Sequence, residues 1–100
     1  MKTHTNLNPK ILRFAVDMQD RLDKNRHKGE WSNCDIRWLL MKLIEEVGEL
    51  SVEINTMYTP DGKPRGDSIG TQSYAEMKAQ MKCADVANLA MMISDILKGN

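Results

Sequence analysis

The sequence predicts an all-α fold, a bundle of three main helices with a long loop between the second and the third. Apolar residues recur at steps of three and four along three separate stretches, which is the period of a helix that buries one face. Pro and Gly residues gather between these stretches, and Gly48 is the one glycine expected inside a helix. At 100 residues the chain forms one domain, residues 1–100, and a core of this size is incompletely buried without a partner.

The first helix is expected over Pro9–Arg26. Asn8 precedes Pro9, and an N-cap followed by proline at the first helical position is a common way to start a helix. Gly29 is the natural stop in the connection that follows. The apolar residues of this helix recur at steps of four, three and four: Ile11, Ala15, Met18 and Leu22.

The second helix, expected from near Cys34 to about Met57, has the most regular pattern. Ser32 stands three residues before Asp35, which resembles a helix cap. A single internal glycine, Gly48, is tolerated at a modest cost. The apolar residues alternate steps of four and three and form one sector: Ile36, Leu40, Leu43, Val47, Leu50 and Ile54.

The connection over residues 58–72 is expected to be a long, mobile loop without regular helix. It contains Pro60, Pro64, several glycines and the turn pair Asp61-Gly62. Lys63 and Arg65 leave two interpretations open, a lid over an anion or a solvated tether.

The third helix is expected from Ser73, where a capping box begins, to about Lys98, with Gly99 as its stop. Its apolar residues lie on opposite sides: Met77, Met81, Ala84 and Met91 on one, and Val86, Leu89, Ile93 and Leu97 on the other. A helix of this kind has to be buried centrally, and two other helices do not enclose it. We therefore expect an identical chain to complete the bundle, as a homodimer or a dimer of dimers.

Charge and composition narrow the function classes. The formal net charge is +0, from 14 basic and 14 acidic residues, so a nucleic-acid polymer or an anionic membrane is not an expected partner. Cys34 and Cys83 lack C-x-x-C spacing, and no secretion signal or membrane span is found in the sequence. We expect a cytoplasmic protein with reduced thiols and, at most, a small charged ligand.

Acidic residues crowd one border of the apolar sector of the second helix. Side chains three or four apart on a helix lie about 5–6 Å apart at Cβ. Glu46 and Glu49 can therefore hold one cation, or two cations about 3.5–4 Å apart. A solvated flank is the alternative interpretation of such an edge.

Three polar residues of the third helix, Asp85, Asn88 and Asp95, lie within about 80° of one another on an otherwise apolar helix. A buried carboxylate needs a partner. A divalent cation shared with Glu46 and Glu49 would serve Asp85, because Mg²⁺ prefers carboxylate and water oxygens. The structural alternative is that Asn88 hydrogen-bonds a neighbouring backbone and that Asp95 caps the helix or faces solvent.

The motif Glu45-Glu46-x-x-Glu49, followed on the next helix by Cys83-Ala84-Asp85-Val86-Ala87-Asn88, resembles the MazG-like family of the all-α nucleoside triphosphate pyrophosphohydrolases. The resemblance is to short phage and bacterial members and covers about residues 10 to 97. It implies hydrolysis of a nucleoside triphosphate to a monophosphate and pyrophosphate, with Mg²⁺ or Mn²⁺ as cofactor. Two further segments that carry the similarity are His27-Lys28-Gly29-Glu30-Trp31 and Trp38-Leu39-Leu40.

By this resemblance Glu46, Glu49 and Asp85 match metal-ligand positions. Glu45 matches the remaining acidic position, and Glu45 or Glu46 would orient or deprotonate the attacking water. Lys82 departs from the family, which has a glutamate three residues before the aspartate. A lysine there removes a carboxylate and should weaken metal binding, although its long side chain could reach outward and keep its ammonium in water.

Several residues are candidates for binding the substrate. Lys42 and Lys28 could contact phosphate, although Lys42 could instead pair with Glu46 one turn later. Trp31 and Trp38 could stack on a base, although Trp38 also reads as a core residue. Asn88 of the second motif is a further candidate substrate-binding residue.

Three functions remain open from the sequence. The first is an active pyrophosphohydrolase. In the second, the ammonium of Lys82 replaces a metal ion, and the chain binds nucleotides or a protein partner without hydrolysis. In the third, the acidic edge is solvated and the chain is a helical dimerisation module.

Overall fold

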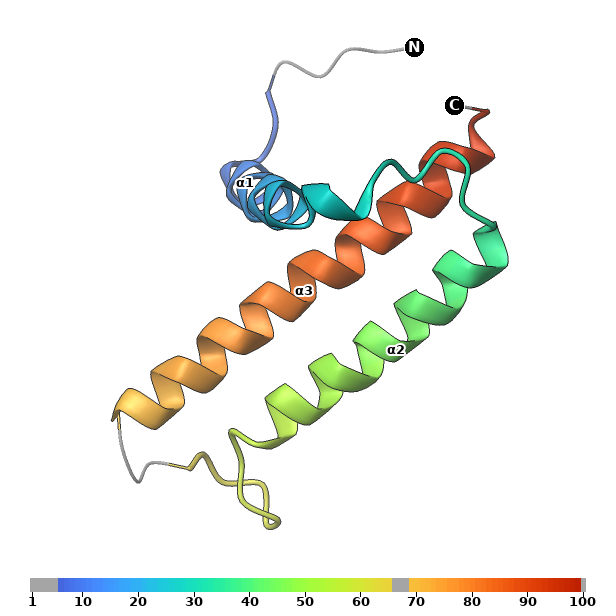
Figure 1. The fold of residues 1–100 in the computed structure, drawn as a ribbon. Coiled ribbons are helices and arrows are strands. Elements are labelled where there is room, and N and C mark those ends of the chain that lie inside the picture. The colour runs from blue at the N-terminus through green and yellow to red at the C-terminus, as the bar shows by residue number, and fades with distance from the viewer. Residues whose placement is uncertain (1–5, 66–68, 100) are drawn as a thin grey trace.

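The computed structural model describes residues 6–65 and 69–99, with only the backbone of residues 69–73. In this part of the chain the regular elements are all helical: α1 (Pro9–Lys24), the 3-10 turn η1 (Arg26–Lys28), α2 (Ile36–Asn55) and α3 (Ile69–Leu97). Helices α2 and α3 lie side by side and run in opposite directions, while α1 crosses α3 steeply (Figure 1). The predicted all-α fold is confirmed.

Helix α1 begins as predicted and ends slightly earlier. The side chain of Asn8 accepts a hydrogen bond from the Lys10 backbone N–H at 2.8 Å, and Pro9 takes the first helical position. The chain then tightens into η1, which ends at Gly29 with φ 88. A positive φ of this size suits glycine, which lacks a Cβ.

Helix α2 begins at Ile36, so the expected cap at Ser32 is wrong. Asp35 is the N-cap, and its carboxylate accepts from the Arg37 backbone N–H at 2.8 Å. Ser32 instead donates from its backbone and its hydroxyl to Glu30. The cap is a carboxylate directly next to the first turn, because only there does it reach the free N–H groups of the helix.

The connection after α2 is more ordered than predicted. The Thr59 N–H donates to the Lys63 carbonyl at 2.7 Å and the Arg65 N–H donates to the Met57 carbonyl at 2.8 Å, which folds the segment back on itself. Residues 66–68 lie outside the described part of the chain.

Helix α3 begins at Ile69, so the prediction of no helix over residues 69–72 is wrong. The expected start at Ser73 is also wrong, because this residue lies inside the helix. Gly70 lies within this helix, because one glycine costs a helix only about 1 kcal/mol. The C-terminal end is as predicted, with Gly99 at φ 87 after Leu97.

Helix α3 packs against both other helices, in keeping with its apolar residues on opposite sides. Leu39, Ala79 and Ala84 are the buried apolar residues of the described chain. Among the described residues, no helix combines the length and apolarity needed to cross a membrane.

Helix α2 is rotated relative to the sequence prediction. Its acidic edge, with Glu46 and Glu53 largely covered, faces α3. Part of the apolar sector consequently faces outward, with Leu40, Val47 and Ile54 exposed. The apolar sector is therefore divided between the contact with α3 and the outer surface of this chain.

Candidate functional site

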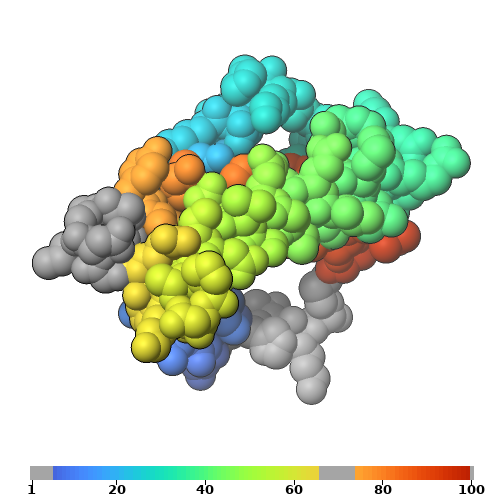
Figure 2. All heavy atoms as spheres, turned by 90° about the horizontal axis from the view of Figure 1, so that it is seen from below, coloured from blue at the N-terminus to red at the C-terminus, as the bar shows by residue number. Residues whose placement is uncertain are grey.

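A cavity of about 580 Å³ lies between the end of α1 with η1, the first half of α2, and α3. The hollow is visible in the space-filling view between residues around 20–30 and α2, with α3 behind (Figure 2). This volume is in the range of small-molecule sites, about 300–1,000 Å³. The cavity brings together eight predicted site residues: Lys28, Trp31, Lys42, Glu45, Glu46, Lys82, Asp85 and Asn88.

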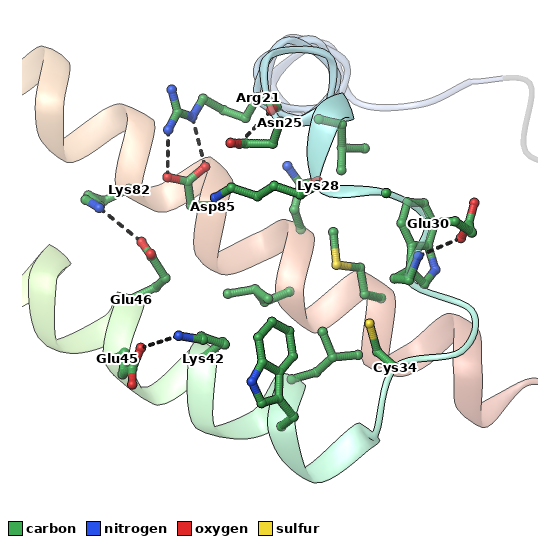
Figure 3. A pocket seen from close by; sticks show the side chains of 18 residues that line it. Arg21, Asn25, Lys28, Glu30, Cys34, Lys42, Glu45, Glu46, Lys82 and Asp85 are labelled. Atoms are coloured by element: carbon green, nitrogen blue, oxygen red, sulfur yellow. Dashed lines mark hydrogen bonds and ion pairs between the residues drawn. The ribbon is translucent and has the colours of Figure 1, made fainter.

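Lys82 holds the position that the sequence assigned to a shared cation. Its Nζ donates to Glu46 Oε2 at 3.2 Å and lies 3.5 Å from Glu49 Oε1 (Figure 3 draws the first contact). Its side chain is 25% exposed, so the expectation that it reaches outward into water is wrong. The ammonium turns inward because two carboxylates face it across the contact between α2 and α3.

The charge of Lys82 is stabilised by these neighbours. Burial lowers the pKa of Lys82, but the hydrogen bond with Glu46 and the charges of Glu46 and Glu49 outweigh it, so the pKa is above its ordinary value. Lys82 is therefore an ammonium at neutral pH and supplies a fixed positive charge to this side of the cavity.

Asp85 is paired with a residue that sequence reasoning missed. Arg21 of α1 donates from Nε to Oδ1 at 2.9 Å and from a terminal nitrogen to Oδ2 at 3.0 Å (Figure 3). The two side chains are only 20% and 15% exposed. The hydrogen bond with Asp85 raises the pKa of Arg21. Arg21 follows Met18 by three residues, so a charged residue on the apolar stripe of the first helix was the available signal.

Asn88 follows the structural alternative. It is 4% exposed, and its amide nitrogen donates to the Met18 carbonyl of α1 at 2.9 Å. Asp95 has a partner that neither expected role, a helix cap or a solvent-facing residue, includes. Its Oδ2 accepts a hydrogen bond from the indole N–H of Trp31 at 2.9 Å. These two bonds attach α1 and the following connection to α3.

Lys42 pairs with Glu45. The alternative considered from the sequence was a pair with Glu46. The distance from Lys42 Nζ to Glu45 Oε2 is 3.3 Å, and the same Nζ lies 5.4 Å from the centroid of the Trp38 ring. Trp38 is 48% exposed, so it is not a core residue. Lys28 extends from η1 across the cavity toward Asp85 (Figure 3).

Each acidic residue of the motif thus faces a cation within the chain: Glu45 faces Lys42, Glu46 and Glu49 face Lys82, and Asp85 faces Arg21. In the described residues, no three His, Cys, Asp or Glu side chains gather as they would around a metal ion. Lys82 and Arg21 thus contact carboxylate oxygens of residues that the resemblance assigns to metal binding. Mg²⁺ or Mn²⁺ binding stays a prediction.

Comparisons of the chain with protein-family models, with curated proteins and with solved structures find no match. The resemblance to the MazG-like family therefore depends on the motif residues and stays a prediction.

Proposed function

We propose that this chain is a MazG-like nucleotide-binding protein that holds a nucleoside triphosphate in the cavity with little need for a divalent metal and little hydrolysis. The observation that carries the proposal is the ammonium of Lys82, 3.2 Å from Glu46 and 3.5 Å from Glu49. It supplies, as part of the chain, positive charge at the place where the motif would gather a metal ion.

The lining of the cavity supports a phosphorylated, aromatic ligand. Arg21, Lys28, Lys42 and Lys82 come from α1, η1, α2 and α3 and all line it. Guanidinium and ammonium groups bind phosphate oxygens. The rings of Trp31 and Trp38 offer apolar faces on which a base can stack.

The same ion pairs argue against fast hydrolysis. A carboxylate that activates water needs a free oxygen with affinity for a proton. One of the two carboxylate oxygens of Glu45 is already engaged by Lys42, and one of Glu46 by Lys82. The role of these carboxylates in our proposal is to hold the two lysines at the cavity.

An active pyrophosphohydrolase is the second candidate. It is favoured by one observation, that Glu45, Glu46 and Asp85 of the two motifs line the same cavity. In that case Glu46, Glu49 and Asp85 would exchange Lys82 and Arg21 for Mg²⁺, which would polarise the phosphate chain.

We also propose that the functional form is a homodimer or a dimer of dimers. Leu40, Ile44, Val47 and Ile54 are exposed at helical spacing on α2. A second copy that covers this stripe would enlarge a core that a single chain leaves small. We place the protein in the cytoplasm, where its free thiols, Cys34 and Cys83, stay reduced.

A panel of ribonucleoside and deoxyribonucleoside triphosphates tests the function. Calorimetry in EDTA measures binding, and pyrophosphate release with Mg²⁺ or Mn²⁺ measures hydrolysis. We expect saturable binding in EDTA and release close to background. Rapid metal-dependent release would instead favour the pyrophosphohydrolase, and no change in heat or Tm with any nucleotide or Mg²⁺ would favour the dimerisation module.

Lys82→Glu and Lys78→Glu are the matched pair for this test. Both replace a lysine of α3 that pairs with a glutamate of α2, but only Lys82 lines the cavity. We expect Lys82→Glu to gain Mg²⁺ affinity and to gain pyrophosphate release, and Lys78→Glu to gain neither.

A further inference from the structure

The Arg21–Asp85 pair joins two helices across one wall of the cavity. Two parallel hydrogen bonds, at 2.9 and 3.0 Å, connect the guanidinium of α1 to the carboxylate of α3. Both residues line the cavity. The guanidinium fork that fits a carboxylate also fits two oxygens of a phosphate group.

Two cationic side chains approach this carboxylate from neighbouring elements. Arg21 contacts Asp85 from α1, and Lys28 extends toward it from η1 (Figure 3). Lys82 stands one helical turn before it, although its ammonium is held by Glu46 and Glu49. Arg21 and Lys28 thus lie where the oxygens of a ligand anion could take the place of the Asp85 carboxylate.

We infer that Arg21 is a phosphate-binding residue that exchanges Asp85 for a phosphate group of the ligand. The inference rests on the proposed nucleotide binding and adds a residue that the motif resemblance does not assign. Asp85 is then an internal competitor of the ligand: it holds the guanidinium in place while the cavity is free of nucleotide, and it lowers the affinity for phosphate.

The rest of the contact between α1 and α3 remains when this pair opens. The hydrogen bond from the Asn88 amide to the Met18 carbonyl, at 2.9 Å, lies nearby and involves neither charged group. Arg21 can therefore change partner without α1 leaving α3.

A double-mutant cycle with inorganic tripolyphosphate and with ATP, titrated calorimetrically in EDTA, tests the exchange. We expect Asp85→Asn to tighten binding by about threefold or more, because Arg21 is released from a charged competitor. We expect Arg21→Gln to weaken binding by about tenfold, the loss of a charge-assisted contact. In the Arg21→Gln background, Asp85→Asn should tighten binding less than it does in the wild type, because it then removes only the repulsion by the carboxylate and not its competition for the guanidinium.

A role of Asp85 through its charge alone predicts a different result. If Asp85 acts only as a nearby negative charge, its removal tightens binding equally with and without Arg21, and the inference is overturned. Arg37 and Asp35 are the matched control, because they form a similar pair at 3.0 Å outside the cavity. Asp35→Asn should leave the affinity unchanged.

Two further readings separate folding from binding. Circular dichroism and Tm of each variant show whether it is folded, and Arg21→Lys keeps the charge without the fork, so it should bind with intermediate affinity. The NMR signal of the Arg21 Nε–H should shift on addition of tripolyphosphate, while that of Arg37 stays in place.

A wild type that binds neither tripolyphosphate nor ATP overturns both the proposed function and the inference. A wild type that binds, with affinity unaffected by Arg21→Gln and no Arg21 shift, overturns the inference alone.

Discussion

Lys78 and Lys82 lie one turn apart on α3 and contact the acidic edge of α2 in similar ways, yet their surroundings differ. Lys78 Nζ lies 3.2 Å from Glu53 and 5.3 Å from the centroid of the Tyr74 ring, with its side chain 41% exposed. Lys82 bridges two glutamates, is more covered, and faces the cavity. Lysines thus neutralise this edge at two places along the contact between α2 and α3, and of the two only Lys82 lies at the cavity.

Reversing the charge of Lys82 or Lys78 should give the largest difference in stability between the two positions. Lys82→Glu places a third carboxylate beside Glu46 and Glu49, and we expect it to lower the free energy of unfolding by about 2–4 kcal/mol without metal. Lys78→Glu should cost about 1 kcal/mol, because Lys78 is more exposed and solvent screens the repulsion from Glu53.

Urea denaturation with and without Mg²⁺ measures both variants. Magnesium should restore stability to Lys82→Glu by binding the folded state, and should leave Lys78→Glu unchanged. An equal response of the two variants to Mg²⁺ would contradict the proposed difference between Lys82 and Lys78.

The outer face of α2 should matter through association. If a second copy covers Leu40 and Val47, each tenfold dilution lowers the apparent stability by about 1.4 kcal/mol, and Tm falls with it. Leu40→Glu or Val47→Glu should yield monomers with reduced Tm. A well-folded monomer of 11.4 kDa in sedimentation at micromolar concentration would contradict this.

Trp31 and Trp38 both line the cavity, and we expect them to differ in their contribution to stability. Trp31→Phe removes the N–H that donates to Asp95 and should cost about 1 kcal/mol of stability. Trp38→Phe removes no hydrogen bond known in the described residues and should change stability less. Thermal denaturation checks both, and a Trp31→Phe variant with unchanged Tm would mean that this bond does not hold the connection between α1 and α2.

The smallest expected effect is on the alkaline side of the pH profile. Because the pKa of Lys82 is raised above its ordinary value of 10.5, its contribution to stability is fully present below that pH and is lost as pH rises through the folded-state pKa. The stability difference between wild type and Lys82→Met should therefore be constant at neutral pH and shrink above pH 10.5. Denaturant unfolding measures this difference from about pH 8 upward, a starting point well below the ordinary lysine pKa. A difference that grows with pH would contradict the pairing of Lys82 with Glu46 and Glu49.

The sequence predicted those parts of the fold that depend on local pattern. The periodic apolar residues identified three helices, and Asn8-Pro9 and Gly99 located two of their ends, because caps and breakers act within a few residues. The start of α3 was missed, since Gly70 interrupts a helix only weakly.

The candidate site depends on contacts between residues far apart in the sequence, and the periodic pattern of apolar residues does not predict such contacts. The motif residues Glu45, Glu46 and Asp85 do come together at one cavity. Arg21 was not identified as the partner of Asp85, which it reaches across 64 positions of sequence. Replacement of a metal ion by the Lys82 ammonium was one of the open interpretations, but the sequence could not choose it, because Lys82 reaches Glu46 across 36 positions. Both contacts depend on how α1 and α2 are rotated against α3, which periodicity alone leaves undetermined.

The most direct test of the central claim is a calorimetric titration of the wild-type protein with the nucleoside triphosphate panel, once in EDTA and once in Mg²⁺. If Lys82 takes the place of a metal ion, at least one triphosphate binds saturably in EDTA, and Mg²⁺ changes its affinity by less than about threefold. Binding that is absent in EDTA and appears only with Mg²⁺ would contradict the account, because the fixed ammonium would then not be sufficient to hold the phosphate chain.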